Sequence, residues 1–273
     1  MENLKQMIDD AVKFIRTKTD ESPKIGIILG TGLGGLAKTI KRDVEVPYDQ
    51  IPHFPVSTVE SHAGRLLFGS VAGKRVVAME GRFHFYEGYS FKQVTFPVRV
   101  MKALGIEILV VSNAAGGMNP QFSKGEICLI TDHINFQGHN PLIGKNDDDI
   151  GPRFPDMYNC YDKDLREIAI KTALDENITL HRGVYVGVTG PNLETAAEYR
   201  FLRIIGGDLV GMSSVPEVIA ARHQGTKVVA FSVVTDMGLP DALEPCSHQK
   251  IVAAAEIAEP KLSKLIEKTV ERM

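Results

Sequence analysis

Short runs of apolar residues, separated by segments with helical spacing, constrain the fold of this chain more than any other feature. The runs at 25–29, 108–111, 184–188 and 228–234 contain almost no polar side chain. A strand that is apolar on both faces has to be covered on both faces, as a parallel strand is when helices lie above and below the sheet. The pattern therefore predicts an α/β protein with a mostly parallel central sheet flanked by helices.

The remaining elements are expected to complete an alternating order of strands and helices. Further strands are predicted at 66–70, 75–80, 126–131 and 210–212. Helices are predicted over about the first twenty residues and at 36–40, 91–104, 165–177, 195–205, 215–223 and 248–273, with Pro260 kinking or restarting the last. No repeat, linker or low-complexity block divides the sequence, so we expect a single domain over residues 1–273.

Composition excludes several classes of function. The net charge is −3 with no basic block, which disfavours nucleic acid or an anionic membrane surface as a partner. No apolar run approaches the length that spans a bilayer. The cysteines Cys128, Cys160 and Cys246 form no CxxC pair, which indicates a reducing compartment and no zinc site. We expect a cytoplasmic protein without a bound metal.

The stretch 81–89 puts a cation, an imidazole and a phenol at alternating positions, as Arg82, His84 and Tyr86. Side chains two apart on an extended segment project from the same face. Arg82 and His84 would then converge on one anion, the guanidinium as a fork of donors and the imidazole as a further donor. The alternative is an ordinary strand exit.

The long segment 135–161, rich in Gly, Pro, Asn and Asp, is also expected to be functional because of its length.

The glycine-rich segment 30–35 matches G-x-G-x-x-G, so a dinucleotide-dependent oxidoreductase is one alternative. That fold needs a crossover helix and then a strand ending in an acidic residue about 20 positions on. Here the helical stretch covers only 36–40, and Pro47, Pro52 and Pro55 follow it. The preferred interpretation is a turn whose backbone N–H groups and Thr31 hydroxyl hold a phosphate.

Six motifs, in this order, resemble those of the trimeric purine nucleoside phosphorylases, a family that also contains methylthioadenosine phosphorylase. They are Gly30-Thr31-Gly32-Leu33-Gly34, His62-Ala63-Gly64-Arg65-Leu66, the 81–89 stretch, Asn113-Ala114-Ala115-Gly116-Gly117, Gly190-Pro191-Asn192-Leu193-Glu194-Thr195 and Gly211-Met212-Ser213-Ser214-Val215-Pro216-Glu217. The resemblance implies a three-layer phosphorylase fold with a mixed sheet and a homotrimer.

The resemblance also implies the reaction. Inorganic phosphate, as co-substrate, would cleave purine ribonucleosides or 2′-deoxyribonucleosides to the free base and ribose 1-phosphate or its deoxy form, with no cofactor. The phosphate would be bound by Thr31, His62, Arg82, His84, Ser213 and the backbone N–H of Ala114. Donors of these kinds suit a dianion. Taken singly, Ser213 could be a helix N-cap and His62 a surface loop residue.

By the same resemblance, the sugar would lie against Tyr86 and Met212, with His248 reaching the 5′-hydroxyl. Without the surrounding motif, Met212 would be read as core packing. Phe154, in the long polar segment, corresponds to the aromatic residue that closes the site of a neighbouring subunit. The active site would then be shared between subunits.

The purine base would be contacted by Glu194 and Asp236, which with His84 are the implied catalytic residues. The residues implied to flank the base are Ala115, Gly116, Leu193, Val210 and Thr235. Leu193 stands where many members carry phenylalanine, which should weaken stacking on the purine. Asp236 replaces the asparagine of the enzymes specific for 6-oxopurines.

The two carboxyl groups point to different bases. An ionised Asp236 would repel N7 and O6, so it must be protonated or face the 6-amino group of adenine. Glu194 instead accepts from N1–H, which hypoxanthine and guanine have and adenine lacks. Inosine and guanosine are the expected substrates, with adenosine a further one, and a methylthioadenosine or adenosine phosphorylase is the alternative. A non-catalytic nucleoside-binding protein would not need His84.

Overall fold

The computed structural model describes residues 3–30, 34–56, 58 and 63–273. Within these residues, nine strands form one mixed sheet in the order β2-β3-β4-β1-β5-β8-β7-β6-β9. The strands are β1 (Ile25–Leu29), β2 (Lys41–Pro47), β3 (Arg65–Val71), β4 (Lys74–Glu80), β5 (Ile108–Gly117), β6 (Ile127–Asn135), β7 (Leu180–Gly187), β8 (Leu209–Gly211) and β9 (Lys227–Met237).

The sheet is mixed and partly closed on itself. Parallel pairs are β1–β4, β1–β5, β5–β9, β6–β7 and β7–β8, and antiparallel pairs are β2–β3, β3–β4, β5–β8 and β6–β9. Because β9 pairs with both β6 and β5, the strands β5, β8, β7, β6 and β9 form a ring. This ring brings the ends of β5, β8 and β9 together.

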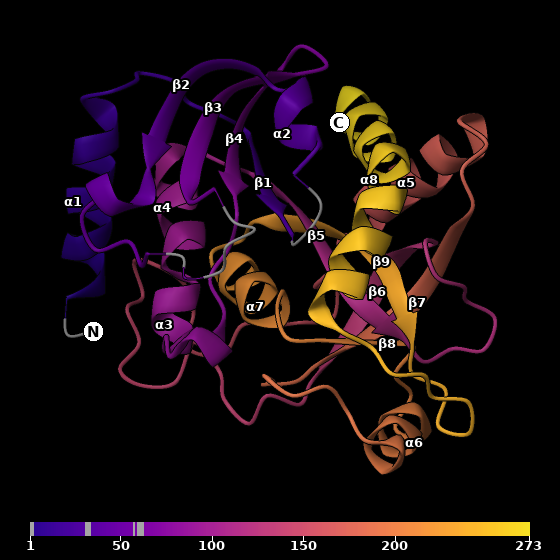
Figure 1. Ribbon diagram of the computed structural model, residues 1–273. Coiled ribbons are helices and arrows are strands. Elements are labelled where there is room, and N and C mark those ends of the chain that lie inside the picture. Colours follow the sequence, from indigo (N-terminus) through magenta and orange to yellow (C-terminus); the bar gives the residue numbers. More distant parts are fainter. Residues whose placement is uncertain (1–2, 31–33, 57, 59–62) are drawn as a thin grey trace.

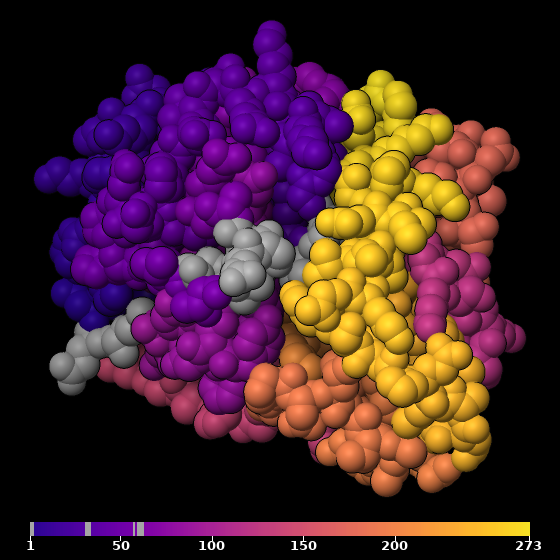
Figure 2. All heavy atoms as spheres, viewed as in Figure 1, coloured from indigo at the N-terminus to yellow at the C-terminus, as the bar shows by residue number. Residues whose placement is uncertain are grey.

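Helices cover both faces of the sheet (Figure 1). They are α1 (Leu4–Arg16), α2 (Leu36–Thr39), α3 (Phe91–Val94), α4 (Phe96–Leu104), α5 (Lys163–Asp175), α6 (Ala196–Ile204), α7 (Val215–His223) and α8 (His248–Glu271). One apolar core holds residues of α1, α4 and α7, and a second holds residues of α2, α5 and α8. The predicted three-layer α/β fold is therefore confirmed. Figure 2 shows α8, in yellow, along much of the visible face.

Several predicted boundaries were wrong. The segment Lys41–Pro47 is the edge strand β2, although Pro47, Pro52 and Pro55 argued against a strand there. It forms because the backbone pairs with β3, while most of its side chains remain exposed. The predicted helix 91–104 is two helices that meet at Thr95. Helix α8 continues through Pro260 instead of restarting there.

No helix in the described part of the chain has the length and apolar character needed to cross a membrane. Among the same residues, no group of three or more His, Cys, Asp and Glu side chains could hold a metal ion.

Candidate active site

A cavity of about 450 Å³ opens where β5, β8 and β9 end beside the start of α8. The predicted site residues that line it are Arg82, His84, Tyr86, Ala114, Ala115, Gly116, Leu193, Glu194, Val210, Met212, Ser213, Thr235, Asp236 and His248. Phe154 does not line it, and its side chain is 87% exposed. Thr31 and His62 lie outside the described residues.

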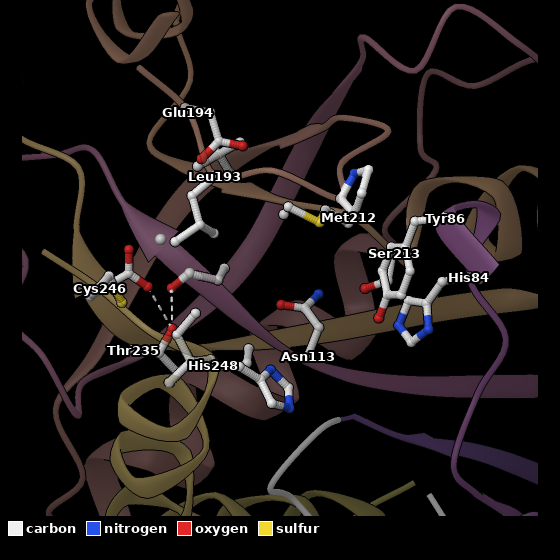
Figure 3. Close-up of a pocket in the computed structure, with 18 of the residues that line it drawn as sticks. His84, Tyr86, Asn113, Leu193, Glu194, Met212, Ser213, Thr235, Cys246 and His248 are labelled. Atoms are coloured by element: carbon white, nitrogen blue, oxygen red, sulfur yellow. Dashed lines mark hydrogen bonds between the residues drawn. The ribbon is translucent and has the colours of Figure 1, made fainter. Parts of the chain in front are cut away.

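The cavity has two chemically different ends (Figure 3). His84, Tyr86 and Ser213 lie at one end, and Leu193, Glu194 and Thr235 lie at the other. We refer to these as the cationic end and the carboxyl end. Met212 and Asn113 lie between the two groups. Since both groups line the same cavity, one bound ligand can contact both.

At the cationic end, Arg82 is almost fully buried and held in place by three residues of one segment. Its Nη1 donates to Ser213 Oγ at 3.0 Å and to Ser214 Oγ at 3.1 Å. Its Nε lies 3.2 Å from Oε1 of the equally buried Glu217. A buried cation needs such a carboxylate, because removal from water is costly for an unpaired charge. The guanidinium therefore has a fixed position.

The segment that holds Arg82 has an unusual backbone conformation. Ser214, at the N-cap of α7, has φ of 62°, which non-glycine residues seldom adopt. Its hydroxyl also accepts from Asn113 Nδ2 at 2.9 Å, and Ser232 Oγ donates to Asn113 Oδ1 at 2.7 Å. These buried contacts tie the start of α7 to β5 and β9, next to Ser213 and Ala114.

His84 is oriented by a carboxylate of its own turn. Glu87 Oε1 lies 2.9 Å from His84 Nδ1 and accepts the backbone N–H of His84 at 2.8 Å. Burial acts to raise the pKa of Glu87, but hydrogen bonds from His84 and Thr58 outweigh it and lower that pKa to about 2. An ionised Glu87 holds a proton on Nδ1 and so fixes the tautomer and the orientation of the His84 ring, which lines the cavity.

Tyr86 reaches the cavity through a turn and not through continued strand geometry. The chain beyond Arg82 and His84 enters a 3₁₀ turn at Phe85–Glu87, and the Tyr86 ring stacks on His84 with centroids 4.6 Å apart. The predicted alternation therefore ends before Tyr86. Burial raises the pKa of the Tyr86 hydroxyl to about 12, so it is a neutral donor near neutral pH.

At the carboxyl end, Asp236 follows Thr235 at the end of β9. The Thr235 hydroxyl lies 2.9 Å from Asp236 Oδ1 and 3.3 Å from the carbonyl oxygen of Ala115. One hydroxyl proton is therefore shared between two acceptors. Oδ2 of Asp236 would stand 3.3 Å from a Cβ added to Gly116, so a glycine there leaves room for a ligand beside the carboxyl. Burial raises the pKa of Asp236, against the hydrogen bond from Thr235.

Glu194 stands just before α6, and its pKa is also raised. Burial is the main cause, and the charge of Asp236 adds to it. The backbone N–H of Glu194 and the hydroxyl of Tyr199 act in the opposite direction, because each stabilises the ionised form. The two carboxyl groups thus lie in one partly desolvated region, and ionisation of one makes ionisation of the other less favourable.

The comparisons agree with this geometry. A family model described as "Phosphorylase superfamily" matches residues 24–271. A Bacillus subtilis protein called purine nucleoside phosphorylase 1 is 54% identical, over 98% of both chains. The Bos taurus purine nucleoside phosphorylase is 47% identical, over 94% of this chain and 91% of its own. The chain belongs to the purine nucleoside phosphorylases.

Solved structures of this family share the fold. A Schistosoma mansoni purine nucleoside phosphorylase in complex with adenosine superposes with a TM-score of 0.93 at 41% identity, covering 100% of this chain and 98% of its own. A schistosoma enzyme in complex with hypoxanthine gives 0.93 at 40% identity, over 98% and 97% of the two chains. The family predicted from six motifs is confirmed, and the dinucleotide-dependent alternative is set aside.

Some residues of this phosphorylase site had no predicted role. Arg82 is contacted by Ser214 and Glu217, and His84 by Glu87. The carboxyl end is also lined by Tyr199 and Cys246. The quoted motifs contain Glu87, Ser214 and Glu217, so a search for carboxylates near Arg82 and His84 could have found the two acids. Nothing in the sequence signals the inward position of Tyr199, because it depends on how α6 packs on β8.

Proposed function

We propose that this protein cleaves purine nucleosides with inorganic phosphate, giving the free base and ribose 1-phosphate or its deoxy form. The observation that carries the proposal is that one cavity has both a cationic and a carboxyl end. Arg82, His84, Ser213 and the N–H of Ala114 suit a phosphate dianion, with Thr31 and His62 proposed to add two donors from outside the described residues. Tyr86, Met212 and His248 would contact the sugar between the two ends.

In this mechanism, a phosphate oxygen bonds to C1′ as the bond from C1′ to N9 breaks. The bonding electrons pass into the purine, so negative charge grows on the leaving base while the sugar becomes cation-like. Arg82 and His84 hold the nucleophile in place, and a donor at N7 stabilises the leaving base. No residue needs to form a covalent bond with the substrate.

The carboxyl end supports 6-oxopurines as the main substrates. Glu194 has two donors that stabilise its ionised form, whereas Asp236 shares one hydroxyl with Ala115. We therefore assign the proton to Asp236, which donates to N7, and the charge to Glu194, which accepts from N1–H. Inosine and guanosine fit both groups. Adenosine fits Asp236 but offers no proton to Glu194, so it should be cleaved less efficiently.

Asp236 is also the observation that favours the second candidate, a methylthioadenosine or adenosine phosphorylase. Its carboxyl can accept from a 6-amino group, which an asparagine oxygen in the oxopurine enzymes would do less strongly. The two candidates differ in which nucleoside has the highest kcat/KM. A panel of inosine, guanosine, adenosine and methylthioadenosine separates them.

We further propose a homotrimer of single-domain chains covering residues 1–273, with sites shared between subunits. The support is Phe154, an aromatic ring that is 87% exposed on a segment without helix or strand. An exposed ring of that size is more stable against another protein surface. The free Cys128 and Cys160 suit a reducing compartment, so we place the protein in the cytoplasm.

The test is an assay of inosine with and without phosphate, with the sugar product identified. The proposal predicts hypoxanthine and ribose 1-phosphate in equal amounts, and no cleavage when phosphate is absent. Release of free ribose without phosphate would identify a hydrolase and contradict the proposal.

A further inference from the structure

A second cavity, of about 890 Å³, lies apart from the active-site cavity. Helices α3 and α4 and the segment 141–150 form much of its wall, together with the start of α1 and the end of α7. Three cationic side chains line it, Lys92, Arg99 and Lys145. None of the three forms an ion pair with a carboxylate among the residues that the structure describes.

Arg99 is the most unusual of these cations because it is buried without a counter-charge. Its side chain is 5% exposed, and its hydrogen bond within the described chain runs from Nη1 to His223 Nδ1 at 3.3 Å. Burial lowers the pKa of Arg99 to about 10. In contrast, the buried Arg82 has Glu217 beside it. A guanidinium with five N–H donors and one such partner is well suited to bind an anion.

His223 cannot supply the missing charge. Its Nε2 lies 3.1 Å from the carbonyl oxygen of Pro152, which can only accept, so this nitrogen carries the proton. Nδ1 is then the lone-pair acceptor for Arg99, and the imidazole is neutral. Burial and the neighbouring Arg99 both lower the pKa of His223, in agreement with a neutral ring. The other N–H groups of Arg99 have no hydrogen-bond acceptor among the described residues, and since Arg99 lines the cavity, a ligand bound there can accept from them.

The side chain of Lys92 reaches the chain segment that carries Lys145, and both lysines line the cavity. Lys92 Nζ stands 2.9 Å from the position that a Cβ on Gly144 would occupy, and Lys145 is the next residue. The carboxylates of Asp147 and Asp148 line the same cavity. They accept from the backbone N–H of Asp149 and from the side chain of Asn146, at 3.1 and 2.7 Å, and not from these cations. Three cations and two carboxylates leave one positive charge.

We propose that this second cavity binds a phosphate group, with Arg99 as the buried anchor and Lys92 and Lys145 as its outer contacts. Phosphate matches the guanidinium fork through two parallel hydrogen bonds, and it also neutralises the charge that burial leaves uncompensated. The same chemistry is offered by inorganic phosphate and by an organic phosphate monoester. This site is separate from the phosphate site proposed for catalysis.

The experiment counts bound phosphate by equilibrium dialysis with radiolabelled inorganic phosphate. Compared with the wild type, Arg99→Gln should bind one phosphate fewer per chain, and so should the double variant Lys92→Gln/Lys145→Gln. The double variant changes half-buried and exposed residues, so it keeps the test valid if Arg99→Gln fails to fold. Lys171→Gln, an exposed lysine on α5, is the matched control and should keep the wild-type number.

A second arm adds ribose 5-phosphate to the wild type. Displacement of the phosphate that depends on Arg99, at lower concentration than unlabelled phosphate requires, assigns the site to a monoester. Displacement only at higher concentration assigns it to inorganic phosphate. An unchanged number of bound phosphates in both variants would overturn the proposal. The proposal would also be overturned if the variants sediment differently from the wild type but bind the same number of phosphates per chain. That result would show that a second copy of the chain, and not phosphate, covers Arg99. Since only the Arg99-dependent phosphate is scored, failure of catalytic phosphate binding gives a different result.

Discussion

The two ends of the active-site cavity differ in how firmly their charges are placed. At the cationic end, Arg82 is fixed by Ser213, Ser214 and Glu217, and His84 by an ionised Glu87. At the carboxyl end, burial disfavours the charge of both Glu194 and Asp236. A preorganised cationic end suits a reactant that is always an anion. At the carboxyl end, Glu194 and Asp236 can each be protonated or ionised, which suits a region that distinguishes one purine base from another.

The largest effect is expected at Arg82, which tests the role of the cationic end. Arg82→Ala removes a fork of charge-assisted donors, so transition-state binding should weaken by about 2–4 kcal/mol, roughly 30- to 1,000-fold in kcat/KM for phosphate. Arg200→Ala removes an exposed cation paired with Asp241 and should change kcat/KM by less than about twofold. A loss of less than about threefold at Arg82, in phosphate-limited assays, would show that it does not bind phosphate.

Arg82→Ala also leaves Glu217 buried without its cation, so the melting temperature of the variant is measured together with its activity. Arg82→Lys keeps the positive charge but not the fork. If only the fork matters for catalysis, Arg82→Lys should keep the melting temperature closer to that of the wild type while losing most of the phosphate affinity. Equal recovery of both quantities would show that a point charge is sufficient.

The next effect concerns Asp236 and tests the carboxyl end. Asp236→Asn places a permanent donor at N7 and O6, so activity on inosine should rise relative to adenosine by about 1–3 kcal/mol, roughly 5- to 150-fold. The measurement is the ratio of kcat/KM for the two nucleosides in both proteins. An unchanged ratio, or one shifted toward adenosine, would show that Asp236 does not contact the base edge.

A smaller effect is expected at Phe154, which lies outside both ends in the single chain. If Phe154 closes the site of a neighbouring subunit in the proposed trimer, Phe154→Ala should raise the KM for inosine by about tenfold without changing the oligomeric state, as removal of an aromatic contact at an interface typically does. Tyr158→Ala is the control, since Tyr158 is a similarly exposed aromatic residue on the same segment. Sedimentation that shows an active monomer at assay concentration would contradict the shared site.

The smallest effect concerns Glu87 and depends on pH. Its pKa is about 2 in the folded protein and 4.5 in its ordinary state, so its charge stabilises the fold above pH 4.5 and this contribution is lost as pH falls toward 2. The melting temperature of Glu87→Gln should therefore lie below that of the wild type at pH 6, with the difference shrinking from pH 5 to pH 2. Glu167→Gln, at an exposed position, should show no such trend. A difference that is constant with pH would mean that Glu87 is not ionised.

The sequence predicted those parts of the molecule that depend on local pattern. Strands such as β1 are buried on both faces and therefore read as apolar runs, whereas β2 is mostly exposed and depends on its pairing with β3. Arg82 and His84 were placed together by their spacing. The supports behind them could not be derived this way, because Ser214 meets Arg82 across 132 positions of the chain. The proton positions at Glu194 and Asp236 depend on burial, which no local pattern encodes.

The most direct test of the separation between the two ends is a double-mutant measurement with Arg82→Lys and Asp236→Asn. We would determine kcat/KM for inosine and adenosine, and KM for phosphate, in the wild type, both single variants and the double variant. We predict that Arg82→Lys raises KM for phosphate and leaves the ratio of inosine to adenosine activity within about twofold. Asp236→Asn should change that ratio and leave KM for phosphate within about twofold, and the two effects should add in the double variant. A shift of the base ratio by Arg82→Lys, or of KM for phosphate by Asp236→Asn, would contradict this prediction.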